Sequence, residues 1–148
     1  MTRAQFKAKT AARLALGAIF FVFGLNGFLH FLPMPAPTGV AATFMGGMAA
    51  TGYFFPLLKG TEVLAGLLLL GNRYVPLALT VLAPIVLNIV LFHVFVAPAG
   101  LVLPLVIVAL GVYLAYTERA VFAPMLRAKS DEAVPPSARV DGHAAAAA

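Results

Sequence analysis

Four long apolar segments constrain the fold of this chain more than any other feature of its sequence. They lie at about residues 14–32, 54–71, 75–96 and 101–117, and each approaches the roughly 20 residues that a helix needs to cross a bilayer. The 148-residue chain is 62% hydrophobic and only 10% charged, with a mean hydropathy of +0.99. Soluble domains are only about half apolar, and one of this length has too little interior for such a surplus. The sequence therefore predicts an all-α integral membrane protein, built as a four-helix bundle.

The positive charges predict how the bundle is oriented. Nine of the ten Lys and Arg residues lie before the first segment, in the turn after the second, or after the fourth. The connections at 33–53 and 97–100 carry no charged residue. By the positive-inside rule, we expect a multi-pass protein of a bacterial inner membrane, with a basic N-terminus (1–13) and a C-terminus that are both cytoplasmic. Because these charges flank apolar segments, the pI of about 10.0 indicates a lipid bilayer as partner and no nucleic acid.

Two regions outside the four segments also carry predictions. The connection 33–53 is long, weakly polar and free of charge, so we expect a short interfacial or re-entrant helix at about 38–50 that satisfies its backbone. The stretch 123–148 is polar, contains proline and ends in poly-alanine, which predicts a disordered cytoplasmic tail. The chain has no cysteine, which excludes thiol chemistry and cysteine-ligated clusters.

Strongly polar side chains interrupt three of the four apolar segments. A charge at the bilayer centre costs roughly 2.5–3.5 kcal/mol on insertion scales, so such residues are candidates for function. With a rise of about 1.5 Å per residue, the predicted topology places all of them in the outer half of the membrane. We expect them to form a ligand-binding site in the outer half of the bundle: Asn26, His30, Lys59, Glu62, Asn88 and His93.

Glu62 is the residue of this set that we expect to exchange protons. Lys59 lies three residues before it on the same helical face, and Gly66 lies four residues after it, where another helix can approach closely. A carboxylate at this depth needs donors or a cation around it. We therefore expect Glu62 to face the interior and to bond Lys59 or a polar residue of another segment. The alternative is structural, with Lys59 snorkelling to the headgroups and Glu62 neutralising it.

The remaining polar residues differ in how well their spacing supports a shared site. Asn26 and His30 are four residues apart, which puts them on one helical face. Asn88 and His93 are five apart, or about 140° around an ideal helix, so they point in different directions. No metal site is predicted. Axial haem ligation by His30 and His93 is an alternative that no sequence motif supports.

Two stretches of the sequence resemble the DoxX family of small membrane proteins. They are EVLAGLLLLGNRYVPLAL at 62–79, with a glutamate early in the second segment, and GLNGFLHF at 24–31. The resemblance covers about residues 14–122 and implies four short spans with cytoplasmic termini. Family members are associated with quinone-coupled sulfur oxidation, with membrane oxidoreductase assemblies and, in distant relatives, with chaperoning of membrane proteins. Only Glu62 lies where the family motif has its acidic residue.

The resemblance and the polar residues together lead to one main functional expectation. We expect a membrane subunit or accessory of a quinone-linked redox system, with the quinone bound at the outer-half site. One alternative is a non-enzymatic assembly factor or chaperone that docks onto another membrane or redox protein. Another is a small-solute transporter, which with four spans would have to act as a homo-oligomer.

Overall fold

The computed structural model describes residues 2–126, and this part of the chain is helical with short connections and no strand. The prediction of an all-α protein is thus confirmed for these residues. The helices, with two 3-10 turns marked η, are α1 (Arg3–Leu29), α2 (Gly39–Ala50), α3 (Phe54–Leu70), α4 (Val75–Phe95), η1 (Pro98–Gly100), α5 (Val102–Thr117), α6 (Arg119–Phe122) and η2 (Ala123–Leu126).

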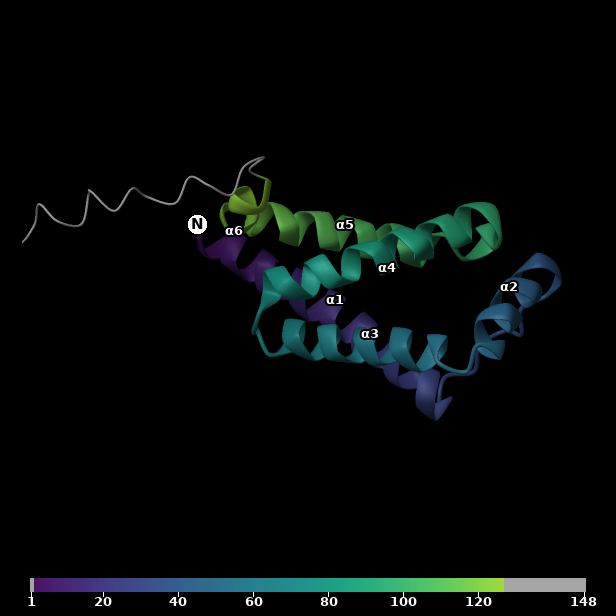
Figure 1. Cartoon of the computed structure of the whole chain (residues 1–148). Coiled ribbons are helices and arrows are strands. Elements are labelled where there is room, and N and C mark those ends of the chain that lie inside the picture. Colours follow the sequence, from purple (N-terminus) through teal and green to yellow (C-terminus); the bar gives the residue numbers. More distant parts are fainter. Residues whose placement is uncertain (1, 127–148) are drawn as a thin grey trace, which may run out of the picture.

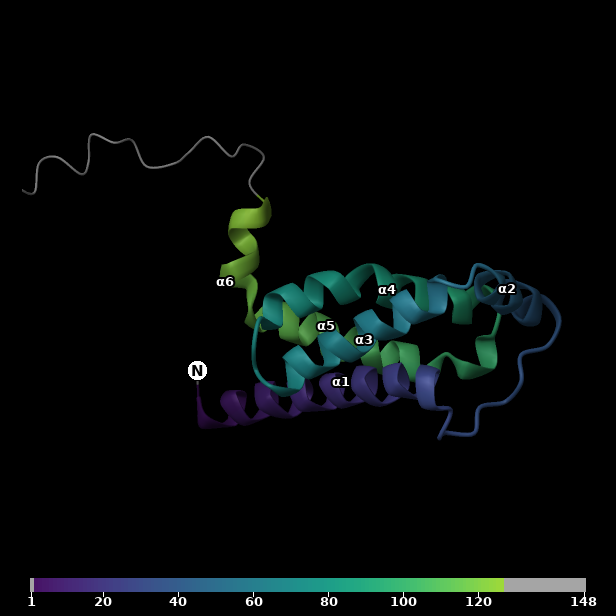
Figure 2. The same cartoon turned by 60° about the horizontal axis from the view of Figure 1, so that its bottom comes forward.

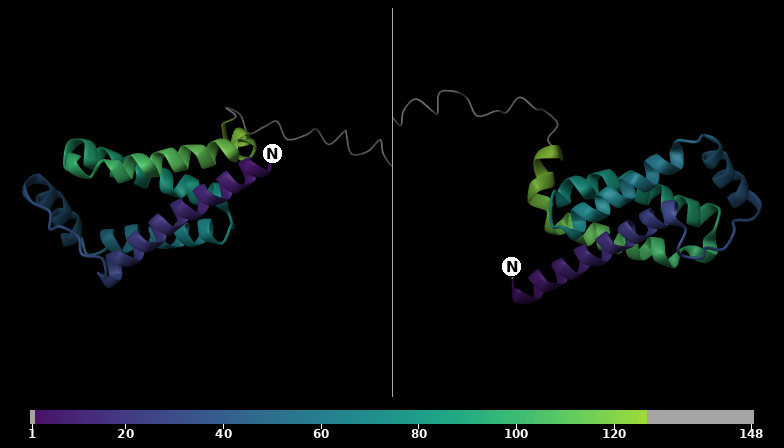
Figure 3. Two further views of the ribbon diagram at one scale, coloured as in Figure 1. Left: turned by 180° about the vertical axis from the view of Figure 1, so that it is seen from behind. Right: turned by 90° about the horizontal axis from the view of Figure 1, so that it is seen from below.

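The four longest helices lie side by side, as Figure 1 shows. Helix α1 contacts α3 and α5, and α4 contacts the same two helices. The start of α1, the turn between α3 and α4, and α6 lie at one end of the molecule, which we call the α6 end (Figures 1 and 2). Helix α2 lies at the opposite end, the α2 end, and the views in Figure 3 agree with this arrangement.

Helix α1 begins earlier and ends earlier than the expected span at 14–32. It starts at Arg3 because Thr2 and Gln5 form a reciprocal capping box, with a 2.8 Å bond from the Thr2 amide to the Gln5 side chain. It ends at Leu29 because His30 adopts the left-handed conformation, with φ of 52°. Hydropathy marks only the apolar part of the helix, so the polar first turns were not recognised as a continuation of it.

The helix expected at 38–50 is present as α2, and it lies across the end of the molecule. The chain turns by 92° between α2 and α3, where Gly52 supplies a φ of 72° that few other residues adopt. The location of α2 at a membrane surface stays a prediction.

A second sharp turn, of 73°, separates α5 from α6 and the residues that follow it. Helix α6 was not predicted. The first four residues of the expected disordered tail, 123–126, form η2, and the remainder of that tail lies outside the described residues.

Between two and four helices are candidates to cross a membrane. Helices α1 and α4 are long and apolar enough by themselves, whereas α3 and α5 reach the required length only together with α2 and α6. The buried core joins the four longest helices and is entirely apolar: Ala12, Leu16, Phe20, Ala65, Leu69, Val75, Ala78, Leu79, Leu82, Ile107 and Leu114. Large apolar side chains also cover the outside, as expected for a surface in contact with lipid.

Helices α1 and α3 pack with their backbones in close approach. A Cβ atom at Gly66 would lie 2.6 Å from the Phe21 amide nitrogen and 2.9 Å from the Gly17 carbonyl oxygen. A Cβ atom at Gly24 would lie 2.9 Å from the Val63 amide nitrogen. The expected close approach at Gly66 is confirmed, and α1 is the helix that makes it.

Arg13 fastens the same helix pair at the α6 end. Its side chain is buried, with 8% exposed, and its guanidinium donates to the carbonyls of Leu69 and Leu70, the latter at 3.0 Å. These carbonyls belong to the last turn of α3, where backbone donors are scarce, although the Leu69 carbonyl also accepts the Asn72 amide at 3.2 Å. From the sequence Arg13 was only one of the flanking positive charges. The structure shows it as an interhelical cap.

We predict that Gly66→Ala destabilises the protein while Gly60→Ala does not. Both glycines lie in α3, but a Cβ atom at Gly60 meets nothing within 4 Å. The added methyl at Gly66 forces α1 and α3 apart and should cost about 1–3 kcal/mol. The matched methyl at Gly60 should be neutral or stabilise the helix by up to about 1 kcal/mol.

Thermal unfolding of the purified protein in a mild detergent, followed by circular dichroism, measures both effects. Equal melting temperatures for the two variants would contradict the close approach of α1 and α3.

Candidate functional site

Lys59 and Glu62 form an ion pair in the first turns of α3, toward the α2 end. The Lys59 Nζ atom donates to Glu62 Oε2 at 2.7 Å. Glu62 is 3% exposed, whereas the Lys59 side chain is 23% exposed and so reaches the surface. The prediction that Glu62 faces the interior and bonds a neighbouring polar residue is confirmed, and the partner is Lys59.

Two glycines of α1 make room for this ion pair. At Gly24 a Cβ atom would lie 3.1 Å from the Cβ of Glu62, and at Gly27 it would lie 2.6 Å from the Cδ of Lys59. The aliphatic part of Lys59 therefore lies along the α1 backbone, and its ammonium group returns to the carboxylate. The stretch 24–27 thus has a direct structural purpose, which is to let α1 cover a charged pair.

Asn26 and His30 do not join this pair. Asn26 is buried, but its Oδ1 accepts the Leu32 amide at 2.6 Å, so it holds the chain that leaves α1. His30 lies beyond the last helical residue and is exposed. The expectation that Asn26 and His30 share a helical face was wrong, because the left-handed conformation at His30 ends the helix between them.

The two polar residues of α4 point in different directions, as their spacing predicted. Asn88 is exposed, whereas His93 is half-buried and its Nδ1 lies 2.7 Å from the Ile89 carbonyl oxygen. The His93 ring packs against Gly100, where a Cβ atom would lie 3.0 Å from Nε2. Within residues 2–126, no hydrogen bond joins either residue to Lys59 or Glu62.

The six predicted residues therefore lie between the middle of the bundle and the α2 end without forming one cluster. In the described part of the chain every buried side-chain polar atom has a hydrogen-bond partner. Asn26 and Glu62 are thus satisfied by the protein itself, which favours a structural role for them.

No described region gathers three or more metal-ligating side chains. His30 and His93 are not joined by any interaction that the structure shows.

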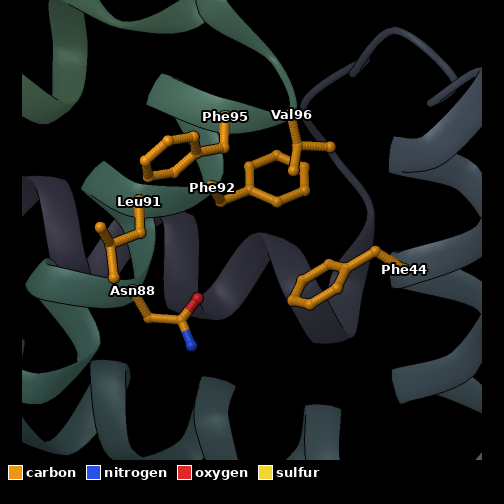
Figure 4. Close-up of a pocket in the computed structure, with 6 residues that line it drawn as sticks. All are labelled: Phe44, Asn88, Leu91, Phe92, Phe95 and Val96. Carbon is orange, nitrogen blue, oxygen red and sulfur yellow. The ribbon is translucent and has the colours of Figure 1, made fainter.

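Asn88 lines an open, apolar hollow between α2 and α4 that the sequence did not reveal. The hollow has a volume of about 220 Å³, and Figure 4 shows its lining: Phe44, Asn88, Leu91, Phe92, Phe95 and Val96. Phe44 of α2 and Phe92 of α4 face one another with ring centroids 5.5 Å apart. Phe44 is the single aromatic residue of α2, and this was the available signal that α2 docks on another helix.

No protein-family model, curated protein or solved structure matches this chain. Membership of the DoxX family therefore stays a prediction based on residues 24–31 and 62–79. Gly24, Gly27 and Gly66 of these stretches all lie where α1 meets α3. Helix packing is thus a sufficient physical reason for the small residues in them.

We predict that Glu62→Leu destabilises the protein and that adding Lys59→Met recovers most of the loss. The single substitution leaves an ammonium group without its partner and should cost roughly 1–3 kcal/mol. The double substitution removes both charges, and replacing a buried pair by apolar groups is often nearly neutral. Thr61→Val is the control, because Thr61 is half-buried in the same turn, carries no charge and bonds only the Leu57 carbonyl.

A double-mutant cycle on melting temperatures tests this coupling. If Glu62→Leu alone leaves stability unchanged, the interior ion pair is contradicted.

Proposed function

We propose that α1, α3, α4 and α5 cross a bacterial inner membrane as a four-helix bundle with both termini in the cytoplasm. Two observations support this. The outside of these helices is rich in exposed apolar side chains. The exposed Lys and Arg residues of the described chain all lie at the α6 end: Arg3, Lys7, Arg73 and Arg119. In this arrangement α2 lies at the outer surface.

Reporter fusions test the topology. We expect a fluorescent protein fused after residue 130 to fluoresce and alkaline phosphatase at the same position to be inactive, because the first folds in the cytoplasm and the second needs the periplasm. Phosphatase inserted between Gly46 and Gly47 of α2 should be active. The opposite pattern would overturn the orientation.

We further propose that the protein is a DoxX-like accessory subunit of a quinone-linked redox system and that the hollow between α2 and α4 receives the quinone ring. The observation that carries this proposal is an exposed amide among aromatic side chains. Phe44 and Phe92 offer faces for stacking against a planar ring. The Asn88 side chain lines the same hollow, and its amide nitrogen can donate to a quinone carbonyl.

We also propose Glu62 as the group that exchanges protons toward the α2 end. Its carboxylate is covered by α1, but Lys59 connects it to the surface. This role is separate from ring binding, because the hollow contains neither residue. Substitutions in the hollow should therefore change binding without breaking the ion pair.

Assembly of another membrane protein is the second candidate function. It is favoured by α4, whose buried residues all lie between Val75 and Leu82. From residue 83 onward α4 presents exposed apolar side chains, among them Leu87, Leu91 and Phe95. A transmembrane helix of a partner could cover this surface and place a side chain in the hollow.

We predict that Asn88→Leu lowers the quinone bound to the purified protein about fivefold, the equivalent of one hydrogen bond of about 1 kcal/mol. Phe92→Ala should lower it further, because the stacking face is lost. Thr80→Val is the matched control, since Thr80 is exposed near the α6 end of the same helix. Protein reconstituted with ubiquinone or menaquinone is extracted after purification, and the quinone is quantified by chromatography.

Equal quinone content in all variants would refute the hollow as the binding site. A wild-type protein that binds no quinone but retains a membrane protein, and loses it on Phe92→Ala, would replace the redox proposal by the assembly role.

A further inference from the structure

We propose that the α6 end carries a binding surface for anionic phospholipid headgroups, formed by Arg3 and Lys7 of α1 and by Arg119 of α6. This inference concerns the end of the molecule opposite the hollow. It does not depend on quinone binding or on the DoxX resemblance.

The charges of the described chain leave this end strongly positive. Residues 2–126 contain two carboxylates, and both are occupied by internal ion pairs. Glu62 pairs with Lys59, and Glu118 pairs with Lys9 at 2.6 Å. Arg13 is buried against backbone carbonyls, so it is not available to a headgroup. The exposed cations of this end therefore have no carboxylate partner within the described residues.

The Lys9–Glu118 pair brings the two parts of the surface together. It fastens the early turns of α1 to the residue that directly precedes α6. Arg119 is the next residue, and its guanidinium lies 4.6 Å from the centre of the Tyr116 ring and donates to the Tyr116 carbonyl at 3.2 Å. Arg3 and Lys7 lie four residues apart on one face of α1. Cations from two helices are thus held at the same end by a short, partly buried ion pair.

Exposed apolar side chains beside these cations favour a lipid surface over a soluble polyanion. Phe6 is 65% exposed between Arg3 and Lys7, and Val121 and Met125 are 52% and 65% exposed after Arg119. The segment Arg119–Met125 turns by 73° away from α5, so it runs across the bundle axis rather than along it (Figure 2). Cationic residues next to apolar ones on a crosswise segment are typical of helices that lie in a bilayer interface.

The number of cations sets how strongly this surface should prefer an anionic lipid. A Lys or Arg near an anionic membrane surface contributes about 1 kcal/mol, or about fivefold in affinity. The three residues act through phosphate charge, so the preference for an anionic lipid should fall as salt is raised.

Native mass spectrometry of the full chain in a mild detergent tests the surface, with phosphatidylglycerol and phosphatidylcholine as probes. We expect the wild type to prefer phosphatidylglycerol. Arg3→Gln with Lys7→Gln should lower that preference about 25-fold, and adding Arg119→Gln should lower it again. Arg73→Gln is the matched control, because Arg73 is exposed at the same end but lies in the α3–α4 turn, and it should retain most of the preference.

A variant that adds a cation separates lipid binding from damage to the fold. Ala4→Lys places a further positive charge beside Arg3 and Lys7 at an exposed position of α1 and leaves the Lys9–Glu118 pair intact, so it should raise the affinity for phosphatidylglycerol. Loss of structure cannot produce that increase.

Two further measurements distinguish a lipid headgroup from free inorganic phosphate as the ligand. Millimolar inorganic phosphate should not displace phosphatidylglycerol, and Phe6→Ser should weaken both lipids. Equal affinity for the two lipids, an unchanged preference in the triple variant, or displacement by inorganic phosphate would each overturn the proposal.

Discussion

The backbone contact between α1 and α3 is the interaction on which the rest of the structure depends. Glycines at 17, 24, 27 and 66 bring the two helices together, and a polar side chain of α1 fastens one end. Arg13 caps the last turn of α3 at the α6 end, and the Lys59–Glu62 pair lies under α1 toward the α2 end. In an apolar solvent such contacts stabilise more than burial of hydrocarbon does, because lipid already solvates apolar side chains. The α4 and α5 helices pack onto this pair through an ordinary apolar core.

The helical class, the expected 38–50 helix and the interior position of Glu62 could all be predicted from the sequence. Each follows from local chemistry: apolar length, a charge-free connection that needs internal hydrogen bonds, or a carboxylate that needs a cation. What could not be predicted depended on contacts between distant residues. Arg13 looked like a flanking charge because its acceptors, the carbonyls of Leu69 and Leu70, are backbone atoms without a sequence signature. The hollow at Phe44 and Phe92 likewise needs the 92° turn before α3.

Similar depth along different helices turned out to be a weak predictor of contact. Lys59, Glu62, Asn88 and His93 all lie toward the α2 end, yet the ion pair faces α1 while Asn88 faces a hollow under α2. Depth fixes only one coordinate of a residue, and rotation about the helix axis fixes which neighbour it meets. His93 illustrates the point, since five residues beyond Asn88 its ring packs on Gly100.

The lengths of the apolar helices have a consequence for the bilayer that would surround them. The part of α1 that follows Arg13, residues 14–29, is about 24 Å long, and α3 and α5, with 17 and 16 residues, span about 24–26 Å. A typical hydrocarbon core is about 30 Å thick, so all three segments fall short of it. A bilayer around such a bundle would have to thin locally, and hydrophobic mismatch of this kind favours residence in thin regions of a membrane.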